Sequence, residues 1–159
     1  MKKLSQESLP AASLWQAGTF VGKDILESAE IKPTYERLRI LKYLEENNNH
    51  PTINMIYNEV VKDIPTVSKT TVYNALNLFV EKGLVLPLVI TGTEIRYDRK
   101  TKPHHHFLCE KCGKIYDIDI ECPYFKKGYI DGHKITELHG YFKGICKECL
   151  QKESKKEKK

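Results

Sequence analysis

Four of the five cysteines form two pairs with the spacing of a metal site. Cys109 and Cys112 are three positions apart, as are Cys146 and Cys149, and 33 residues separate the two pairs. Two such knuckles can surround one tetrahedral ion with four thiolates, which is the shell of structural Zn²⁺. A redox-active CxxC pair is the alternative, but it needs only one knuckle and a βαβ context that the sequence does not indicate. We therefore predict one structural zinc ion, with Cys122 left as a free thiol.

Three consecutive histidines precede the first knuckle. On an extended strand His104 and His106 project to one face and His105 to the other. Carboxylates flank this pair in the sequence, and another histidine lies before a predicted helix. Imidazole and carboxylate groups together give a shell suited to Fe²⁺ or Mn²⁺, with a vacant position possible, whereas the alternative is a hydrated surface cluster. The candidate ligands are His50, Asp98, His104, His106 and Asp117.

A helix that begins after Ser68 carries the candidate DNA-binding face. Ser68 is a good N-cap residue, apolar residues recur at helical spacing from Val72 to Phe79, and Gly83 supplies the stop. The opposite face is polar and has no acidic residue before Glu81. Such side chains can reach phosphates and base edges. They are Lys69, Thr70, Tyr73, Asn74 and Asn77.

The elements around this helix predict a winged helix. Helical patterns begin at Lys23 and after Thr34, and Thr52 caps a third helix that ends near Pro65. Two β-rich runs follow at residues 84–90 and 94–97, separated by a short turn that contains Gly92. This order would place the last helix in the major groove and the hairpin over the DNA backbone. The alternative is an ordinary helical domain with a solvated polar face.

After Asp98 the composition changes to histidine, cysteine and short β-like runs at residues 114–120 and 133–145. The sequence therefore predicts an α+β protein with two domains. We expect an extension over residues 1–22, a winged-helix DNA-binding domain over 23–98, a hinge over 99–103, a metal-binding domain over 104–150 and a Lys-rich tail over 151–159.

The total charge is weak evidence for a nucleic-acid partner. The 159 residues carry 26 Lys+Arg and 21 Asp+Glu, a net +5, but residues 151–159 alone hold five Lys and two Glu. Affinity for DNA would then depend on where four cations of the body point. Apolar runs long enough for a membrane span or a signal peptide are missing, so we expect a cytoplasmic protein without a membrane partner. The four cations are Lys69, Lys82, Arg96 and Arg99.

Taken together, these residues resemble the ferric uptake regulator (Fur) family of metal-dependent repressors, over about residues 25–150. Asp117 and Asn74 stand where iron-uptake members tend to have Glu and Arg, so the resemblance is nearest to the peroxide-sensing, PerR-like branch. The motifs that carry it are His50-Pro51-Thr52, Ser68-Lys69-Thr70-Thr71-Val72-Tyr73-Asn74-Ala75-Leu76, Arg96-Tyr97-Asp98, His104-x-His106-x-x-Cys109-x-x-Cys112-Gly113-Lys114-x-x-Asp117 and Gly144-Ile145-Cys146-x-x-Cys149.

The resemblance implies a winged helix joined by a hinge to an α/β dimerisation domain, and a homodimer on a palindromic operator in double-stranded DNA. It implies one structural Zn²⁺ and one regulatory Fe²⁺ or Mn²⁺ per subunit, and oxidation of His50 or His104 by peroxide at bound iron. It assigns the regulatory ion to His50, Asp98, His104, His106 and Asp117. From the polar face of the helix that begins after Ser68, we expect operator contacts by Ser68, Lys69, Thr70, Thr71, Tyr73, Asn74 and Asn77.

Other functions stay open. Pro103, Tyr124 and His139 depart from the iron-uptake pattern, so we expect the additional metal site of that group to be absent or altered. The second hypothesis is a Fur-type iron or manganese uptake regulator that does not sense peroxide. The third is a metallo-hydrolase, which would need an acid or base beside an open metal position. Because the nearby carboxylates are all used as ligands, we expect a DNA-binding protein rather than an enzyme.

Overall fold

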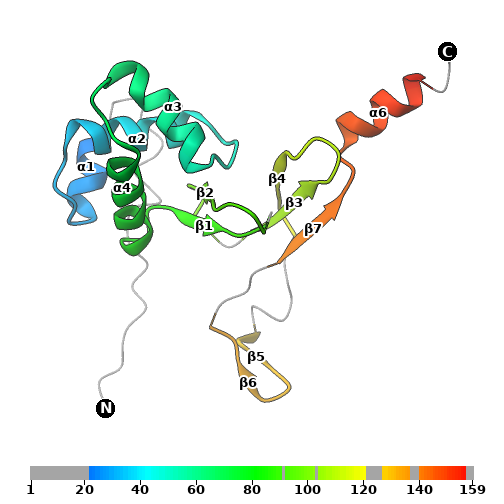
Figure 1. Cartoon of the computed structure of the whole chain (residues 1–159). Helices are drawn as coiled ribbons and strands as arrows, with labels where there is room; N and C mark the ends of the chain where they lie inside the picture. The colour runs from blue at the N-terminus through cyan, green and yellow to red at the C-terminus, as the bar shows by residue number, and fades with distance from the viewer. Residues whose placement is uncertain (1–21, 91, 103, 121–126, 137–139, 157–159) are drawn as a thin grey trace.

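The structure, a computed structural model, describes residues 22–90, 92–102, 104–120, 127–136 and 140–156. The expected extension before Gly22 lies outside these residues, as does the expected free thiol of Cys122. Four helices gather at one end of the molecule and a three-stranded sheet forms the other end, with a small hairpin between them (Figure 1).

The helical end is organised by three N-caps. Its helices are α1 (Gly22–Ser28), α2 (Tyr35–Glu46), α3 (Ile53–Asp63) and α4 (Lys69–Glu81). The side-chain oxygens of Thr34, Thr52 and Ser68 accept hydrogen bonds from backbone N–H groups in the first turns of α2, α3 and α4. Each cap satisfies a donor that the helix itself leaves unpaired. The three predicted helix starts are therefore confirmed.

Helix α4 presents its apolar stripe to the core. Val72, Ala75, Leu76 and Phe79 are all buried, and they pack in one cluster with buried residues of α1, α2 and α3. The helix is terminated at Gly83, whose φ of +70° is a left-handed conformation that glycine adopts without strain. The stripe and the stop fix which side of α4 faces solvent.

The predicted hairpin is present but its strands are short. β1 (Leu86–Leu88) pairs antiparallel with β2 (Arg96–Asp98). Outside these three paired positions Val89 and Ile95 are exposed, since no neighbouring strand covers them in the described residues. Four helices followed by this hairpin give the predicted winged helix.

A three-stranded sheet forms the core of the C-terminal half. β3 (His105–Cys109) is the central strand, antiparallel to β4 (Ile115–Ile118) and parallel to β7 (Tyr141–Gly144). A separate hairpin joins β5 (Tyr129–Ile130) to β6 (His133–Lys134), and α6 (Lys147–Lys156) follows β7. Helices in one half and this sheet in the other confirm the predicted α+β class.

Two features differ from the sequence prediction. The β-like run at residues 133–145 was wrong as one element, because β6 pairs with β5 whereas β7 pairs with β3 in another sheet. Gly140, just before β7, allows β7 to lie close to β3, because a Cβ at this position would lie 2.7 Å from Nδ1 of His105. Helix α6 was not predicted, and it continues through residue 150 into the Lys-rich tail.

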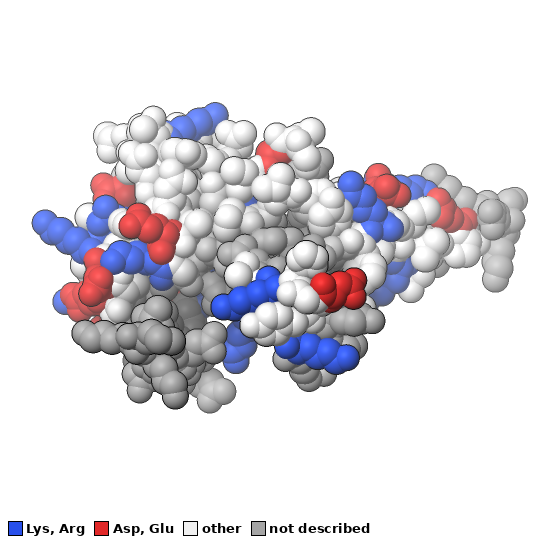
Figure 2. Space-filling view, turned by 90° about the horizontal axis from the view of Figure 1, so that it is seen from below, with Lys and Arg blue, Asp and Glu red and all other residues white. Residues whose placement is uncertain are grey.

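The surface charges of the described residues are mixed in sign. Seen from below, Lys and Arg side chains lie beside Asp and Glu side chains on the helical end and along α6 (Figure 2). This view shows no single basic face among the described residues. No described helix is both long enough and apolar enough to cross a membrane.

Candidate functional site

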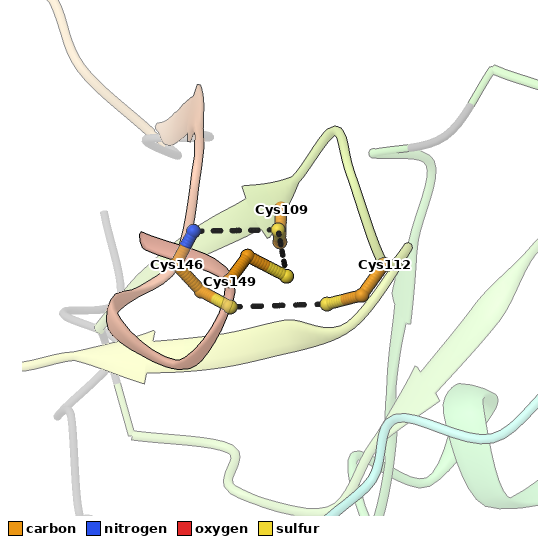
Figure 3. Close-up of side chains that lie close together, drawn as sticks. All are labelled: Cys109, Cys112, Cys146 and Cys149. Carbon is orange, nitrogen blue, oxygen red and sulfur yellow. Dashed lines mark hydrogen bonds between the residues drawn. The ribbon is translucent and has the colours of Figure 1, made fainter. Parts of the chain in front are cut away.

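The two cysteine knuckles meet beside the central strand of the C-terminal sheet. Cys109 ends β3, and Cys149 lies in the first turn of α6. The parallel pairing of β3 with β7 places Cys109 opposite Gly144, which brings the second knuckle against the first. Figure 3 shows the four side chains pointing into one small volume.

The sulfur positions fit a tetrahedral zinc ion. The Sγ atoms are 4.0 Å apart in the pair Cys109–Cys149 and 3.8 Å apart in the pair Cys112–Cys146. Sulfurs bonded tetrahedrally to zinc at about 2.3 Å are separated by about 3.8 Å. All four cysteines are free thiols. Because both contacts join one knuckle to the other, the arrangement differs from a redox pair within a single CxxC.

Backbone hydrogen bonds favour the thiolate form of Cys109, whereas burial raises the pKa of Cys149 to about 12. Burial alone would raise the pKa of Cys109, but backbone N–H groups, that of Cys146 first, donate to its sulfur and lower the pKa to about 6. The Cys146 N–H lies 3.3 Å from this sulfur. A thiolate is the form that binds metal. Salt bridges from Lys111 and Lys114 to acidic residues of α6 further hold the two knuckles together.

A second cluster lies where the two halves of the chain meet. Its members come from the loop before α3, the end of β2, the start of β3 and strand β4. One ligand atom from each of five residues lies within 4.8 Å of all the others. Ligands on opposite sides of a divalent ion are about 4–5 Å apart. The residues are the five predicted ones: His50, Asp98, His104, His106 and Asp117.

The atoms of this cluster converge without pairing fully to one another. Nε2 of His50 lies 2.8 Å from Oδ1 of Asp117, and Nε2 of His104 lies 3.0 Å from Oδ2 of Asp98. Yet both these nitrogens are buried and lack a hydrogen bond of good geometry in the described structure. Unpaired buried nitrogens are costly, so their convergence indicates a shared cation as the missing partner.

Burial and hydrogen bonding favour the ligand forms of these groups. Burial lowers the pKa of His50, which keeps its imidazole neutral and able to bind a metal. For Asp98 burial alone would raise the pKa, but hydrogen bonds with His106 and from the Lys100 N–H lower it overall. Nδ1 of His104 lies 2.8 Å from the Lys102 carbonyl, so Nδ1 donates and Nε2 keeps a free lone pair.

His50 is placed by its backbone. Its φ of +47° is in the left-handed region, an unusual conformation for a residue with a side chain. The wing holds the adjoining chain: the Tyr97 N–H donates to the Pro51 carbonyl at 3.0 Å, and the Arg96 guanidinium lies 3.4 Å from the His50 carbonyl. His50 is thus positioned by contacts with β2 rather than by a helix.

The histidine alternation on β3 is as predicted. His105 faces away from the cluster, with Nδ1 3.4 Å from the Gly140 carbonyl and its ring against Phe142. His133 lies exposed on β6, and His139 is outside the described residues. Neither His105 nor His133 joins a group of potential ligands in the described part of the chain.

The polar side of α4 is exposed, as its pattern predicted. Two of the predicted DNA-contacting residues, Ser68 and Thr71, also form the N-cap of α4. The Ser68 hydroxyl lies 2.8 Å from the Thr71 hydroxyl and accepts a hydrogen bond from the Thr71 N–H. Nζ of Lys69 lies 5.4 Å from the ring centre of Tyr57, a cation–π contact that restrains the lysine. The exposed residues are Lys69, Thr70, Thr71, Tyr73, Asn74 and Asn77.

All four cations expected to set DNA affinity have partners within the chain, since Lys69 lies over the Tyr57 ring. Lys82 pairs with Glu30 and Arg99 with Glu45, while Arg96 reaches the His50 carbonyl. The sequence reasoning did not identify Arg96 or Lys100 as neighbours of the metal cluster. Lys100 follows Asp98 by two positions, and at this spacing a carboxylate commonly accepts the backbone N–H. This spacing could have identified Lys100 as a neighbour of Asp98.

A winged helix joined to a sheet domain, with a thiolate cluster in one half and a histidine–carboxylate cluster between the halves, defines a metal-responsive DNA-binding regulator. The chain belongs to the ferric uptake regulator family, whose sequence profile matches residues 28–124. This match gives no support to the hydrolase hypothesis.

Similar proteins include regulators of both kinds considered above. The chain is 34% identical over 132 residues to the peroxide-responsive repressor PerR of Staphylococcus aureus, covering 80% of this chain and 88% of that protein. The Campylobacter jejuni peroxide stress regulator superposes with a TM-score of 0.60 at 30% identity, covering 80% of this chain and 95% of that one. The Vibrio cholerae ferric uptake regulator superposes with a TM-score of 0.64 at 25% identity, covering 78% of this chain and 98% of that one.

Proposed function

We propose that this protein is a peroxide-responsive, metal-dependent repressor that binds a palindromic operator as a homodimer. The observation that carries the proposal is the five-residue cluster, because His50 belongs to the helical half while His104, His106 and Asp117 belong to the sheet half. A cation bound there joins the two halves. The similarity to two peroxide regulators favours peroxide as the signal.

An ion bound by the five residues would hold the helical half against the sheet half. If only the closed arrangement presents all of them, an ion at about 100 times its dissociation constant stabilises closure by roughly 2.7 kcal/mol. Such a free energy changes a population by about a hundredfold. The exposed polar side of α4 would then be held in the orientation that a palindrome requires.

Peroxide sensing requires loss of one ligand. Bound Fe²⁺ would supply the electron-transfer chemistry with hydrogen peroxide. The net change is transfer of one oxygen atom to an imidazole carbon of His50 or His104, with release of water. His50 is supplied by the loop before α3, so its oxidation would leave Asp98 on β2 as the one remaining member of the cluster from the winged helix, weaken the connection between the halves and release the operator.

The thiolate cluster has a different role. Cys109, Cys112, Cys146 and Cys149 would hold one zinc ion per subunit and leave it no open position for a substrate. The ion would connect β3 to α6 and stabilise the C-terminal sheet. Exposed apolar side chains in this half, among them Tyr141 and Phe142 on β7, would form the contact with a second copy.

The decisive experiment compares operator binding with Fe²⁺ and with Mn²⁺ in a gel-shift assay on the DNA upstream of the protein's own gene. We expect binding only with metal, release by hydrogen peroxide of the iron form, and protection of the manganese form. Mass spectrometry of the released protein should find one added oxygen atom on His50 or His104. Oxygen on Met1 or Met55 alone would contradict peroxide sensing.

The alternative is an iron or manganese uptake regulator without a peroxide response, which the similarity to the Vibrio cholerae ferric uptake regulator keeps in view. In that case peroxide would release neither metal form from the operator. Failure to bind DNA with any metal would contradict both repressor hypotheses.

A further inference from the structure

The two carboxylates of the histidine–carboxylate cluster are oriented in the same way. Oδ2 of Asp98 lies 3.0 and 3.2 Å from Nε2 of His104 and His106, while its Oδ1 accepts the Lys100 N–H at 2.8 Å. Oδ1 of Asp117 lies 2.8 Å from Nε2 of His50, while its Oδ2 lies 3.6 Å from Nζ of Lys100. Each carboxylate therefore directs one oxygen to the histidines and the other to Lys100.

The Lys100 ammonium is itself held in position. It lies 3.3 Å from Oδ1 of Asp119, which is two residues after Asp117 and so projects from the same side of the extended chain. Lys100 belongs to the segment between β2 and β3, while both aspartates lie on or next to β4. A single side chain thus connects this segment to β4 at the edge of the cluster.

Two effects of the ammonium oppose each other. Its charge repels a divalent cation, but Asp119 balances that charge and the side chain is 43% exposed, so solvent weakens the repulsion. Its contact also fixes the orientation of Asp117, and partners of this kind typically change metal affinity by about 10–100-fold. We expect the orientation of Asp117 to affect metal affinity more than the charge repulsion does. Because Lys100 is partly exposed, we expect a change near the lower end of the range of about 10–100-fold.

We propose that Lys100 is a positioning residue of the regulatory metal site, and that its ammonium keeps Asp117 as a ligand through one oxygen only. This inference rests on the proposed function, since it concerns the same cluster. The second oxygen of Asp117 is engaged by the ammonium, so each of the five residues supplies a single atom. Without the ammonium, that oxygen is free to enter the shell and raise the coordination number.

The test measures Mn²⁺ affinity of the zinc-loaded, full-length protein by competition with a fluorescent chelator. K100M should weaken binding by roughly tenfold, whereas K100R, which retains the charge, should bind as the unmodified protein does. D119N should weaken binding in the same direction but less, because it removes only one of the two anchors. K62M is the matched control, since it breaks the surface ion pair of Lys62 with Glu59.

A spectroscopic measurement reports the coordination directly. Co²⁺ added to the zinc-loaded protein should show weaker d–d absorption in K100M than in the unmodified protein and K100R, because six-coordinate Co²⁺ absorbs less than five-coordinate Co²⁺. Unchanged affinity and spectrum in K100M, or a gain in affinity, would overturn the positioning role alone. Failure of the unmodified protein to bind Mn²⁺ or Co²⁺ would overturn the proposed function as well.

Discussion

His50 shows how one residue can combine an unfavourable backbone with a useful position. Its left-handed φ of +47° and its buried, unpaired nitrogens both raise the free energy of the metal-free protein. A bound cation would satisfy the Nε2 nitrogen. Strain concentrated at a ligand is consistent with a site whose closed form depends on the ion.

Replacement of His50 by Ala should weaken Mn²⁺ binding by about 100-fold or more, because it removes a ligand and not merely a partner of one. The thiolate cluster shares no residue with this site, so the zinc content should be unchanged. Mn²⁺ titration and elemental analysis measure the two quantities. The control is His133→Ala, an exposed histidine on β6. Equal Mn²⁺ affinity of the two variants would count against the five-residue site.

At the scale of elements, α4 is stabilised by its N-cap as well as by its apolar stripe. The Ser68 hydroxyl accepts the Thr71 N–H at 3.0 Å and also contacts the Thr71 hydroxyl. This bond fixes the first turn, where Lys69 and Thr70 are exposed. A single serine thus influences both the stability of the helix and the presentation of its polar face.

Ser68→Ala should reduce the free energy of unfolding by about 1 kcal/mol, the usual value for a lost N-cap. Urea denaturation followed by circular dichroism measures this change. Ser154→Ala is a suitable control, because its exposed hydroxyl donates to the Leu150 carbonyl within α6 and caps no helix start. Equal stability of the two variants would show that the Ser68 hydrogen bond contributes little.

At the scale of the whole molecule, the two clusters have different structural roles. The thiolate cluster is local to the C-terminal half, whereas the histidine–carboxylate cluster includes residues from both halves. Loss of the first should disrupt one half, and loss of the second should uncouple the halves without unfolding either. The two metals can therefore be removed with different consequences.

Zinc removal, either by a strong chelator under reducing conditions or by Cys146→Ser, should unfold the C-terminal sheet and leave α1–α4 folded, because those helices have their own core. Amide hydrogen exchange should show lost protection in β3, β4, β7 and α6, with protection of α1–α4 unchanged. Mild chelation that removes Mn²⁺ but retains zinc is the control and should keep that protection. Retained protection after complete zinc loss would contradict a structural role.

The proposed homodimer can be tested on the apolar surface of β7. The Phe142 side chain is 46% exposed in the single chain, so Phe142→Asp should place a charge in the proposed contact and shift the protein toward monomers. Sedimentation velocity measures the change. Tyr35→Asp, at a 64% exposed position on α2, should leave the assembly unchanged. A monomeric unmodified protein would contradict the dimer itself.

Much of this protein could be predicted because the signals are local. The helix starts were predicted from the N-cap residues Thr34, Thr52 and Ser68. The apolar stripe from Val72 to Phe79 predicted the buried side of α4, and the spacing of the cysteines defined the two knuckles. Each of these depends on residues only a few positions apart, where backbone geometry alone determines which side chains can meet. The α+β class follows from the same patterns, whereas the set of five candidate ligands, which joins His50 to residues far along the chain, was assigned by the resemblance to the family.

The tertiary structure decided what depends on partners far away in the chain. It turned Lys82, Arg96 and Arg99 toward internal groups, assigned β6 and β7 to different sheets, and placed α6 against the first knuckle. It also set which oxygen of Asp117 faces His50 and which faces Lys100. Long charged side chains and short strands have several partners of similar energy. Only the packing of distant segments selects among them, so the sequence could name the candidate ligands but not their orientation.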